Sequence, residues 1–388
     1  MISKYFTFDD SLKRFEVFYS GKKTKYLGLK IKIVLSLLLK GKISFPKLFN
    51  IFVSFYSYLF KLKTSAKTPV VVNFELSNKC NEHCVFCRDE KGKIFDMNES
   101  GKYIEKGRLD YDIFHNIVEE IKKTTLLIIP YVNGEPFIYK HLDKVLNLLN
   151  VNKLGSMLSS NGILLNEKNI DLIIKEDLDQ IKVHVSGWTN KVHQIQHRLG
   201  DVEKIKENLT NLSKKIKQHK SRMIVLVDYI LYDHNKHEVE EFRKFTNDLD
   251  FGFNIRPGNP RGMEGSEKLQ PSDKAAINNP CEWLWKVMTV NWNGDLLPCC
   301  EYVTWGNYHK FAKYIKDDDN KNQKTNENQT NMNENWLGKE TPLKTTQSVI
   351  DTWNGKRIVE MRMVHKTKGR APIPICAGCT KTGVEYKF

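Results

Sequence analysis

Through its middle, the sequence alternates short β-rich runs with amphipathic helical stretches, and this alternation is the strongest constraint on its fold. Strands that are each followed by a helix predict a parallel arrangement, either in an open sheet or in a partial barrel. Ligands of such folds bind at the carboxyl ends of the strands. The β-rich runs are Val70–Leu76, Thr125–Val132, Lys153–Ser159, Gln180–Ser186, Met223–Leu231 and Phe251–Arg256. The helical stretches are Tyr111–Lys123, Lys140–Leu149, Asn166–Lys175, Val202–Lys217 and His237–Asp248.

The alternation divides the 388 residues into three regions. Residues 1–68 have apolar residues at helical spacing between lysines, and we expect a basic, helical N-terminal extension. Residues 69–260 form the α/β domain, which ends at a turn rich in Pro and Gly. Residues 261–388 carry five of the eight cysteines and are expected to form a small cysteine-rich α+β domain. Within it, residues 316–340 are rich in Asn and Lys, which predicts a disordered insert.

The net charge of +15 is concentrated in the N-terminal extension, where 14 Lys or Arg residues stand against three Asp or Glu residues. Such an excess is typical of a solvated basic face in a lysine-rich proteome, or of contact with an anionic membrane surface or partner. No nucleic-acid-binding signature accompanies the charge, so we expect no nucleic acid partner.

No apolar stretch reaches the roughly 18 residues of a membrane-spanning helix. The best candidate, Leu48–Leu62, contains polar residues and suits an interfacial helix or a packed core helix. No secretory signal is visible, which favours a cytoplasmic protein, with peripheral contact to the inner face of the membrane through residues 1–68 as a further option. Clustered cysteines in a reducing compartment indicate metal binding or catalysis more than disulfides.

Three cysteines, Cys80, Cys84 and Cys87, follow the first β-rich run with the spacing C-x3-C-x2-C. A tight loop can direct three thiolates at one iron-sulfur cluster, and three ligands for four irons leave one iron open for a substrate or cofactor. A zinc site or a fortuitous cysteine loop is the alternative, although His83 lies inside the loop and is poorly placed as a fourth ligand.

The spacing, with the aromatic Phe86 directly before the third cysteine, resembles the fingerprint of the radical S-adenosylmethionine (SAM) superfamily. The resemblance implies a partial (β/α)6 TIM-like barrel over residues 69–256. It also implies a [4Fe-4S] cluster whose open iron chelates SAM, and reductive cleavage of SAM to a 5′-deoxyadenosyl radical that abstracts hydrogen from a substrate. An electron donor such as flavodoxin or ferredoxin would supply the electron.

Other turns at predicted strand ends resemble SAM-contacting segments of this superfamily. Gly134, Glu135 and Pro136 look like the motif that meets the methionine amino group, with Asn133 in place of its first glycine. The resemblance assigns further SAM contacts to Ser159, Asn161, Ser186 and Arg198. Ordinary turns, and a surface salt bridge for Arg198, are the alternatives.

A second thiol group is predicted near the C-terminus. A hairpin turn at Gly294 would bring Cys281 and Cys299 together, and Cys376 and Cys379 form a C-x2-C pair. Four thiolates suit either zinc or a [4Fe-4S] cluster. The pattern resembles the twitch form of the SPASM domain, which implies an auxiliary [4Fe-4S] cluster. By spacing, Cys299 is a better ligand candidate than its neighbour Cys300.

The substrate is the least constrained part of the prediction. Arg256 follows the last predicted strand and is our catalytic candidate for contact with an anionic substrate, either a small molecule or a lipid-linked one. The resemblance suggests oxidation or epimerisation of a sugar, cyclitol or cell-envelope intermediate. A peptide-modifying maturase and a non-catalytic iron-sulfur or zinc scaffold are the alternatives.

Overall fold

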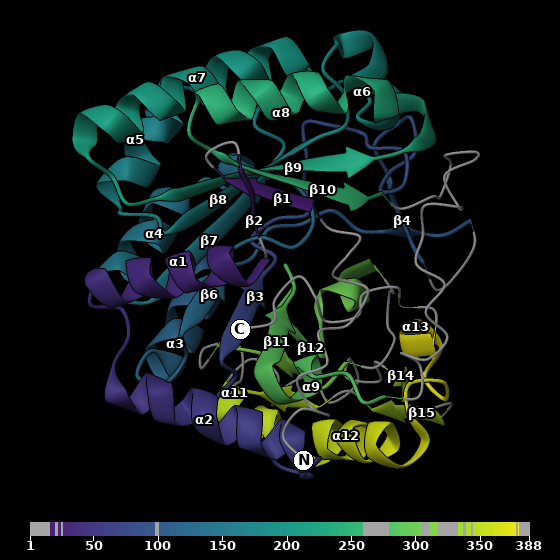
Figure 1. Cartoon of the computed structure of the whole chain (residues 1–388). Coiled ribbons are helices and arrows are strands. Elements are labelled where there is room, and N and C mark those ends of the chain that lie inside the picture. Colours follow the sequence, from purple (N-terminus) through teal and green to yellow (C-terminus); the bar gives the residue numbers. More distant parts are fainter. Residues whose placement is uncertain are drawn as a thin grey trace.

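The computed structural model describes most of the chain, including the whole predicted barrel (Figure 1). The described residues are 16–19, 22–24, 26–97, 101–258, 279–304, 310–316, 333–336, 339–342, 344–377 and 379.

Parallel strands form the centre of the molecule. They lie in the order β3 (Val71–Phe74), β6 (Leu127–Ile129), β7 (Gly155–Ser160), β8 (Gln180–Val185), β9 (Ile224–Leu231) and β10 (Gly252–Pro257). Every neighbouring pair in this series is parallel. Each predicted β-rich run has become one of these strands. The two end strands pair with other strands instead of with each other, so the barrel is partial, as expected.

The helices that form where the apolar spacing predicted them are α3 (Tyr111–Ile121), α4 (Leu142–Val151), α5 (Glu167–Lys175), α7 (Val202–His219) and α8 (Val239–Asp248). Helix α6 (Asn190–Gln196) was not predicted. Helix α3 illustrates why apolar spacing predicts a helix. It buries Ile113, Phe114, Ile117 and Val118, which lie at i, i+1, i+4 and i+5 and therefore share one face. Asp110 caps this helix by accepting a hydrogen bond from the Asp112 amide. Figure 1 shows α5, α7 and α8 together over one side of the sheet.

The N-terminal extension is only partly helical. Helices α1 (Tyr26–Leu39) and α2 (Phe45–Leu59) agree with the expectation, whereas β1 (Glu16–Tyr19) and β2 (Lys22–Thr24) form a hairpin that the sequence did not predict. The prediction of helix for this hairpin was therefore wrong. Strand β1 pairs antiparallel with β10, so it satisfies the backbone groups of a strand that would otherwise be an edge. Residues 1–15 lie outside the described residues.

The C-terminal region continues the same sheet. Strands β11 (Val287–Val290) and β12 (Asp295–Leu297) form the predicted hairpin at Gly294, and β11 pairs parallel with β3. Strands β13 (Ala312–Tyr314) and β16 (Thr345–Thr346) extend it further. Helices α9 (Trp283–Lys286), α11 (Val349–Trp353), α12 (Lys356–Lys368) and α13 (Pro374–Ala377) complete the region. The expected fold class, a partial barrel with a cysteine-rich α+β region, is confirmed.

The predicted disordered insert, residues 316–340, is described only at its ends. Strands β14 (Asn333–Trp336) and β15 (Lys339–Pro342) form an antiparallel hairpin, because their backbone groups pair with each other despite the polar composition. The expectation of disorder was wrong for β14 and the start of β15, and residues 317–332 lie outside the described residues. None of the described helices is long and apolar enough to cross a membrane.

Candidate functional site

The three-cysteine loop borders a pocket of about 100 Å³ at the carboxyl ends of the barrel strands. The pocket brings together residues that are far apart in the sequence. It is lined by Cys80, Glu82, Cys84, Phe86, Cys87, Arg88, Tyr131, Asn133, Gly134, Glu135, Ser160, Asn161, His184, His197, Ile230 and Arg256.

The cysteine loop is anchored to the turn that follows β6. The Glu135 amide donates to the Lys79 carbonyl at 2.8 Å, and the Arg88 guanidinium donates to the Asn78 carbonyl at 2.6 Å. Gly134 has a φ of +84°, and a Cβ at this position would lie 2.5 Å from the Ser77 carbonyl oxygen. The close contact and the left-handed backbone both require glycine at this position.

The thiols of this loop lie in a setting that suits a cationic cluster. Burial raises the pKa of Cys80 to about 12 and that of Cys84 well above its usual range, so neither would ionise at neutral pH without a positive partner. Cys87 Sγ lies 3.2 Å from Asn133 Oδ1. Two buried polar atoms at the pocket, Glu82 Oε1 and Asn133 Nδ2, have no hydrogen-bond partner among the described residues. The residues present therefore fit an iron-sulfur cluster with a polar ligand.

Glu135 is turned mainly toward strand β7. Its carboxylate accepts hydrogen bonds from Ser160 Oγ and the Asn161 amide, both at 2.9 Å, and from the Phe137 amide at 3.3 Å. Burial raises its pKa to about 7. Pro136 begins the short 3₁₀ helix that follows. The predicted Asn161 also reaches the cysteine loop, because its amide nitrogen lies 3.8 Å from Cys80 Sγ. Both turns thus meet at the loop, as the sequence suggested.

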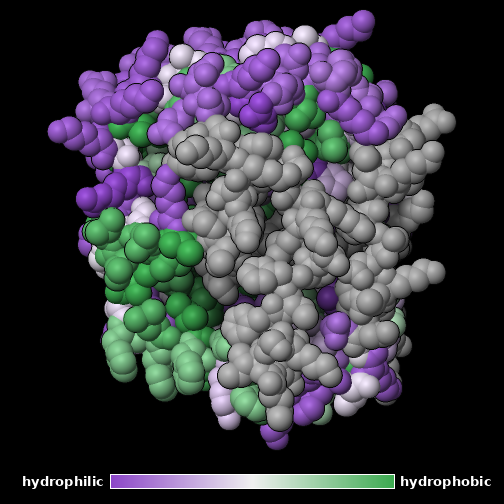
Figure 2. All heavy atoms as spheres, viewed as in Figure 1, coloured by the Kyte–Doolittle hydropathy of each residue, from purple (hydrophilic) through white to green (hydrophobic). Residues whose placement is uncertain are grey.

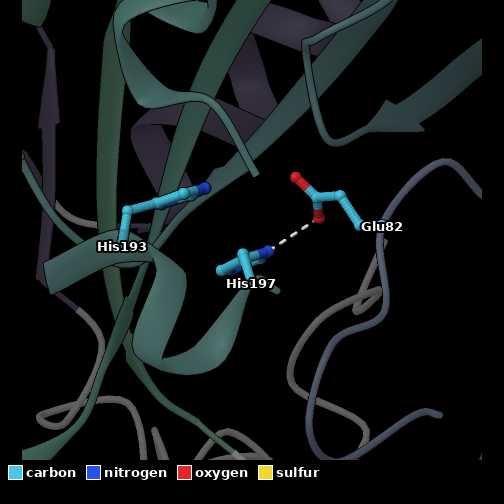
Figure 3. A group of neighbouring side chains, drawn as sticks. All are labelled: Glu82, His193 and His197. Atoms are coloured by element: carbon cyan, nitrogen blue, oxygen red, sulfur yellow. Dashed lines mark hydrogen bonds and ion pairs between the residues drawn. The ribbon is translucent and has the colours of Figure 1, made fainter. Parts of the chain in front are cut away.

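A buried group of Glu82, His193 and His197 braces the loop against β8 and α6 (Figure 3). His197 Nδ1 donates to the Glu82 carboxylate at 2.9 Å, and its Nε2 pairs with the Ser186 hydroxyl at 2.9 Å. The Ser186 amide donates to His193 Nδ1 at 3.2 Å. The atoms lie close enough together for a metal ion, but both His197 nitrogens and one His193 nitrogen already have partners. The group is therefore better described as a hydrogen-bonded brace.

Sequence reasoning missed this brace. It singled out Ser186 and Arg198 as SAM contacts, whereas the Ser186 side chain binds His197 and the Arg198 carbonyl accepts the His83 amide of the loop. The i, i+4 spacing of His193 and His197, which places both on one face of a helix, was the available signal.

The interior of the barrel beside the pocket contains a network centred on Asp228 of β9. Arg256 Nε lies 2.5 Å from its carboxylate and His184 Nδ1 lies 3.2 Å away, while Asn254 donates a further hydrogen bond. Ser159 Oγ pairs with His184 Nε2 at 2.5 Å. Burial would raise the pKa of Asp228, but the charge of Arg256 outweighs it and holds this pKa well below its usual range. Burial lowers the pKa of His184. Ser159 and Arg256, predicted separately, belong to this one network.

The C-terminal cysteines also converge. Burial raises the pKa of Cys281 to about 11 and that of Cys376 to about 12, and Cys379 lies near enough to raise both further. Cys299 is buried close to Cys300, Cys376 and Cys379. The Tyr302 hydroxyl lies 3.6 Å from Cys376 Sγ. The structure thus gathers Cys281, Cys299, Cys376 and Cys379, with Cys300 beside them.

The barrel and the cysteine loop define a class of enzyme that binds a small cofactor at the carboxyl ends of parallel strands. Residues 74–246 match the family model described as the Radical SAM superfamily, so this part of the chain is a radical SAM domain and the predicted resemblance is confirmed. The cofactors of this superfamily are a [4Fe-4S] cluster and SAM, and the cysteine-rich C-terminal region fits an auxiliary cluster.

Curated relatives are distant. The chain is 21% identical over 145 residues to mycofactocin maturase MftC of Mycobacterium ulcerans, which is 37% of each chain, so it spans little more than a third of that relative. It is 20% identical over 347 residues to the tungsten-containing aldehyde ferredoxin oxidoreductase cofactor-modifying protein of Pyrococcus furiosus, covering 79% of this chain and 86% of the relative. It is 30% identical over 130 residues to an S-adenosylmethionine-dependent nucleotide dehydratase of Lacinutrix mariniflava, covering 33% of this chain and 25% of the relative.

Two solved structures illustrate the range of similar folds. Streptococcus suis SuiB bound to S-adenosylmethionine is 12% identical, with a TM-score of 0.46 over 64% of each chain. BtrN in complex with AdoMet and 2-DOIA is 15% identical, with a TM-score of 0.46 over 80% of this chain and 93% of its own.

Proposed function

We propose that this radical SAM enzyme oxidises or epimerises a polar, anionic small molecule such as a sugar, a cyclitol or a cell-envelope intermediate. The observation that carries the proposal is the polar network of Ser159, His184, Asp228, Asn254 and Arg256, which lies inside the barrel next to the cysteine loop. A barrel interior lined with hydroxyl, imidazole and guanidinium groups suits a substrate rich in hydroxyl or anionic groups.

Cys80, Cys84 and Cys87 would hold the [4Fe-4S] cluster, and Phe86, Gly134, Glu135, Pro136 and Asn161 would shape the SAM pocket around it. When bound, the cluster and SAM supply a 5′-deoxyadenosyl radical. Glu82 and Asn133 support this assignment, because each has a buried polar atom at the pocket without a partner among the described residues. Ser186 and Arg198 would support the pocket through the loop contacts described above.

The residues of the network would bind and orient the substrate. Asp228 fixes the Arg256 guanidinium at the pocket, and this ion pair makes Arg256 a rigid contact for an anionic group. His184 is joined to Ser159 on one side and to Asp228 on the other. Both ring nitrogens are thus already paired, so His184 would help to orient the Ser159 hydroxyl and the Asp228 carboxylate toward the substrate.

We further propose that the C-terminal cysteines, Cys281, Cys299, Cys376 and Cys379, hold an auxiliary [4Fe-4S] cluster. The pattern of these cysteines resembles the twitch form of the SPASM domain, and this resemblance favours a cubane over zinc. An electron carrier such as flavodoxin or ferredoxin would serve either cluster.

The experiment is anaerobic reconstitution followed by addition of dithionite and SAM. We expect about eight irons per chain, since each cubane holds four. We also expect 5′-deoxyadenosine to form. The triple variant C80A/C84A/C87A should keep about four irons per chain and form no 5′-deoxyadenosine. About four irons plus one zinc in the wild-type protein would contradict the auxiliary cluster, and an intact cluster that does not cleave SAM would contradict the enzymatic function and favour a scaffold.

A peptide substrate is the second candidate, because mycofactocin maturase MftC is among the relatives. Arg256→Met separates the two, with Arg243→Met on the surface helix α8 as its control. If the substrate is a small anion, Arg256→Met should weaken substrate binding while SAM cleavage without substrate persists. A substrate peptide that binds this variant normally would favour the maturase.

A further inference from the structure

Helix α2 has its polarity reversed relative to an ordinary surface helix. Its buried residues are Lys47, Asn50, Ser54 and Ser57, all of them polar. Surface helices normally bury an apolar stripe and expose a polar one. Here the large apolar residues lie outward, with Phe45, Phe49 and Phe52 each between 58% and 78% exposed.

Specific hydrogen bonds hold the helix in this orientation. Lys47 Nζ donates to the carbonyls of Lys42 and Lys153, and Asn50 donates to the Thr68 carbonyl at 3.0 Å. Ser54 Oγ donates to the Trp285 carbonyl at 2.6 Å. Rotating the helix to bury its aromatic residues would break these buried bonds and leave their acceptors unpaired, which is costly.

The outward residues of α2 join those of α1 in one apolar face. Figure 2 shows these side chains gathered over the two helices, bordered by hydrophilic residues. The apolar face consists of Ile31, Val34, Leu35, Leu38, Leu39, Phe45, Leu48, Phe49, Phe52, Phe55, Tyr56 and Phe60, each at least 41% exposed. Contiguous exposed apolar surface of this kind marks an interaction site.

The charge around the apolar face points to one kind of partner. Residues 26–68 contain eight lysines and no Asp or Glu, and the side chains of Lys40, Lys42 and Lys47 among them are buried. Lys61, Lys63 and Lys67 are exposed just beyond α2. A groove of about 360 Å³ lies next to α1, with Leu35 and Leu39 among its lining and Lys32, Lys217 and Arg222 around it. Aromatic residues with flanking cations and no acidic residue are the composition of an interfacial membrane segment.

We propose that the apolar face of α1 and α2 docks on the surface of an anionic lipid bilayer. The aromatic side chains enter the headgroup region, and the cations around them meet anionic headgroups. This inference goes beyond the proposed function and does not depend on it.

The fold also determines which way the pocket faces when the protein is docked on a membrane. Helix α1 lies at the start of the barrel strands, where Lys42 pairs with Asp179 just before β8 and Leu37 lies beside Gly155, the first residue of β7. The cysteine loop lies at the opposite, carboxyl ends of the strands. A docked molecule therefore turns its pocket away from the bilayer. This geometry favours a water-soluble substrate over one embedded in the same membrane.

The test is sedimentation of the full-length protein with vesicles of phosphatidylcholine alone or with phosphatidylglycerol added. We expect binding to the anionic vesicles that weakens with salt. The variant F49S/F52S should bind at least about tenfold more weakly, since two phenylalanines no longer enter the interface. Val151→Ser is the matched control, because Val151 is 63% exposed but lies at the end of α4, outside the apolar face.

A charge variant tests whether the lysines beside the apolar face contact anionic headgroups. K61E/K63E should also lose binding to anionic vesicles, whereas K168E/K175E on α5 should not. Circular dichroism checks that each variant is folded. The proposal is overturned if wild-type protein does not bind anionic vesicles, or if F49S/F52S binds as tightly as Val151→Ser. Self-association that needs Phe49 and Phe52, without vesicle binding, would identify a second copy as the occupant and also overturn it.

Discussion

At the scale of single residues, Glu75 makes stability depend on pH. Its side chain is fully buried after β3, and one carboxyl oxygen accepts a hydrogen bond from the Trp292 amide at 3.2 Å. Burial raises its pKa from 4.5 to about 8. Between these two values the folded state keeps a proton that the unfolded state has lost. The free energy of unfolding therefore falls as pH rises through this window.

Glu75→Gln should remove this contribution, because the amide oxygen can still accept from Trp292 but does not titrate. Urea unfolding at several pH values from about 5 to about 8 measures the effect. We expect a flatter pH profile for Glu75→Gln than for the wild type. Glu167→Gln, at an exposed position, should leave the profile as it is. An unchanged slope in Glu75→Gln would show that the carboxyl group is already ionised in the folded state.

His197 provides a second prediction, on the brace of the cysteine loop. His197→Leu fills a similar volume but removes the bonds to Glu82 and Ser186, and leaves the Glu82 carboxylate buried without that partner. We expect a loss of about 2–3 kcal/mol in the free energy of unfolding of the iron-free protein. Iron retained by the loop after reconstitution should also fall.

Two comparisons make the His197 result specific. His219→Leu, at the exposed end of α7, should change neither quantity. The iron bound by the C-terminal cysteines should stay constant in His197→Leu. A variant that combines His197→Leu with C80A/C84A/C87A measures this iron, because its loop cannot bind a cluster. Wild-type stability together with wild-type iron content in His197→Leu would mean that the loop does not need the brace.

The sequence predicted the parts of this site that are local. The cysteine spacing and the turns at Gly134 and Asn161 were visible because each motif lies within a few residues. The brace was not, since Glu82 and His197 are 115 residues apart and meet only once β8 and α6 are in place. For the same reason the sequence indicated Arg256 without Asp228, although their ion pair defines the orientation of Arg256.

At the scale of elements, Arg362 of α12 joins the C-terminal helices to the segment after α2. Its buried guanidinium donates to the carbonyls of Leu284, Trp353 and Lys63 and to Asn354 Oδ1. Arg362→Met should cost about 3 kcal/mol or more, because several buried acceptors lose their donor. Thermal or urea unfolding measures the loss. Arg243→Met, which removes the surface ion pair with Glu240, should cost less than about 1 kcal/mol. Equal losses in the two variants would contradict this role.

Elements with a strong apolar period were predictable, and elements defined by a neighbour were not. Helices α3 to α5, α7 and α8 each bury one face, so the period alone identified them. The hairpin of β1 and β2 has no such signal in its own residues. Its position depends on the unpaired edge of β10, which is a property of the assembled sheet. The reversed orientation of α2 is likewise decided by buried bonds to distant carbonyl groups.

At the scale of the whole molecule, one continuous sheet joins regions that the sequence suggested were separate domains. Strand β11 pairs with β3 along four residues, and the Glu75 amide donates to the Val290 carbonyl at 2.8 Å. Strand β1 covers the other end of the barrel sheet at β10. Both edges of the proposed 69–260 unit are therefore paired with strands from outside it, so the expected domain boundaries separate strands that are hydrogen-bonded to each other.

The last prediction follows from these edges. A fragment of residues 69–260 should not fold as a stable monomer, because β3 and β10 would both present unpaired backbone groups and the apolar residues that pack against Leu37 of α1 and Val287 of β11 would be exposed. Expression of the fragment, followed by size-exclusion chromatography and circular dichroism, should give aggregated or unfolded material. A fragment of residues 16–304 restores both neighbouring strands and should be more soluble. A monomeric, cooperatively unfolding 69–260 fragment would mean that the barrel is an independent domain and that its flanking strands are additions.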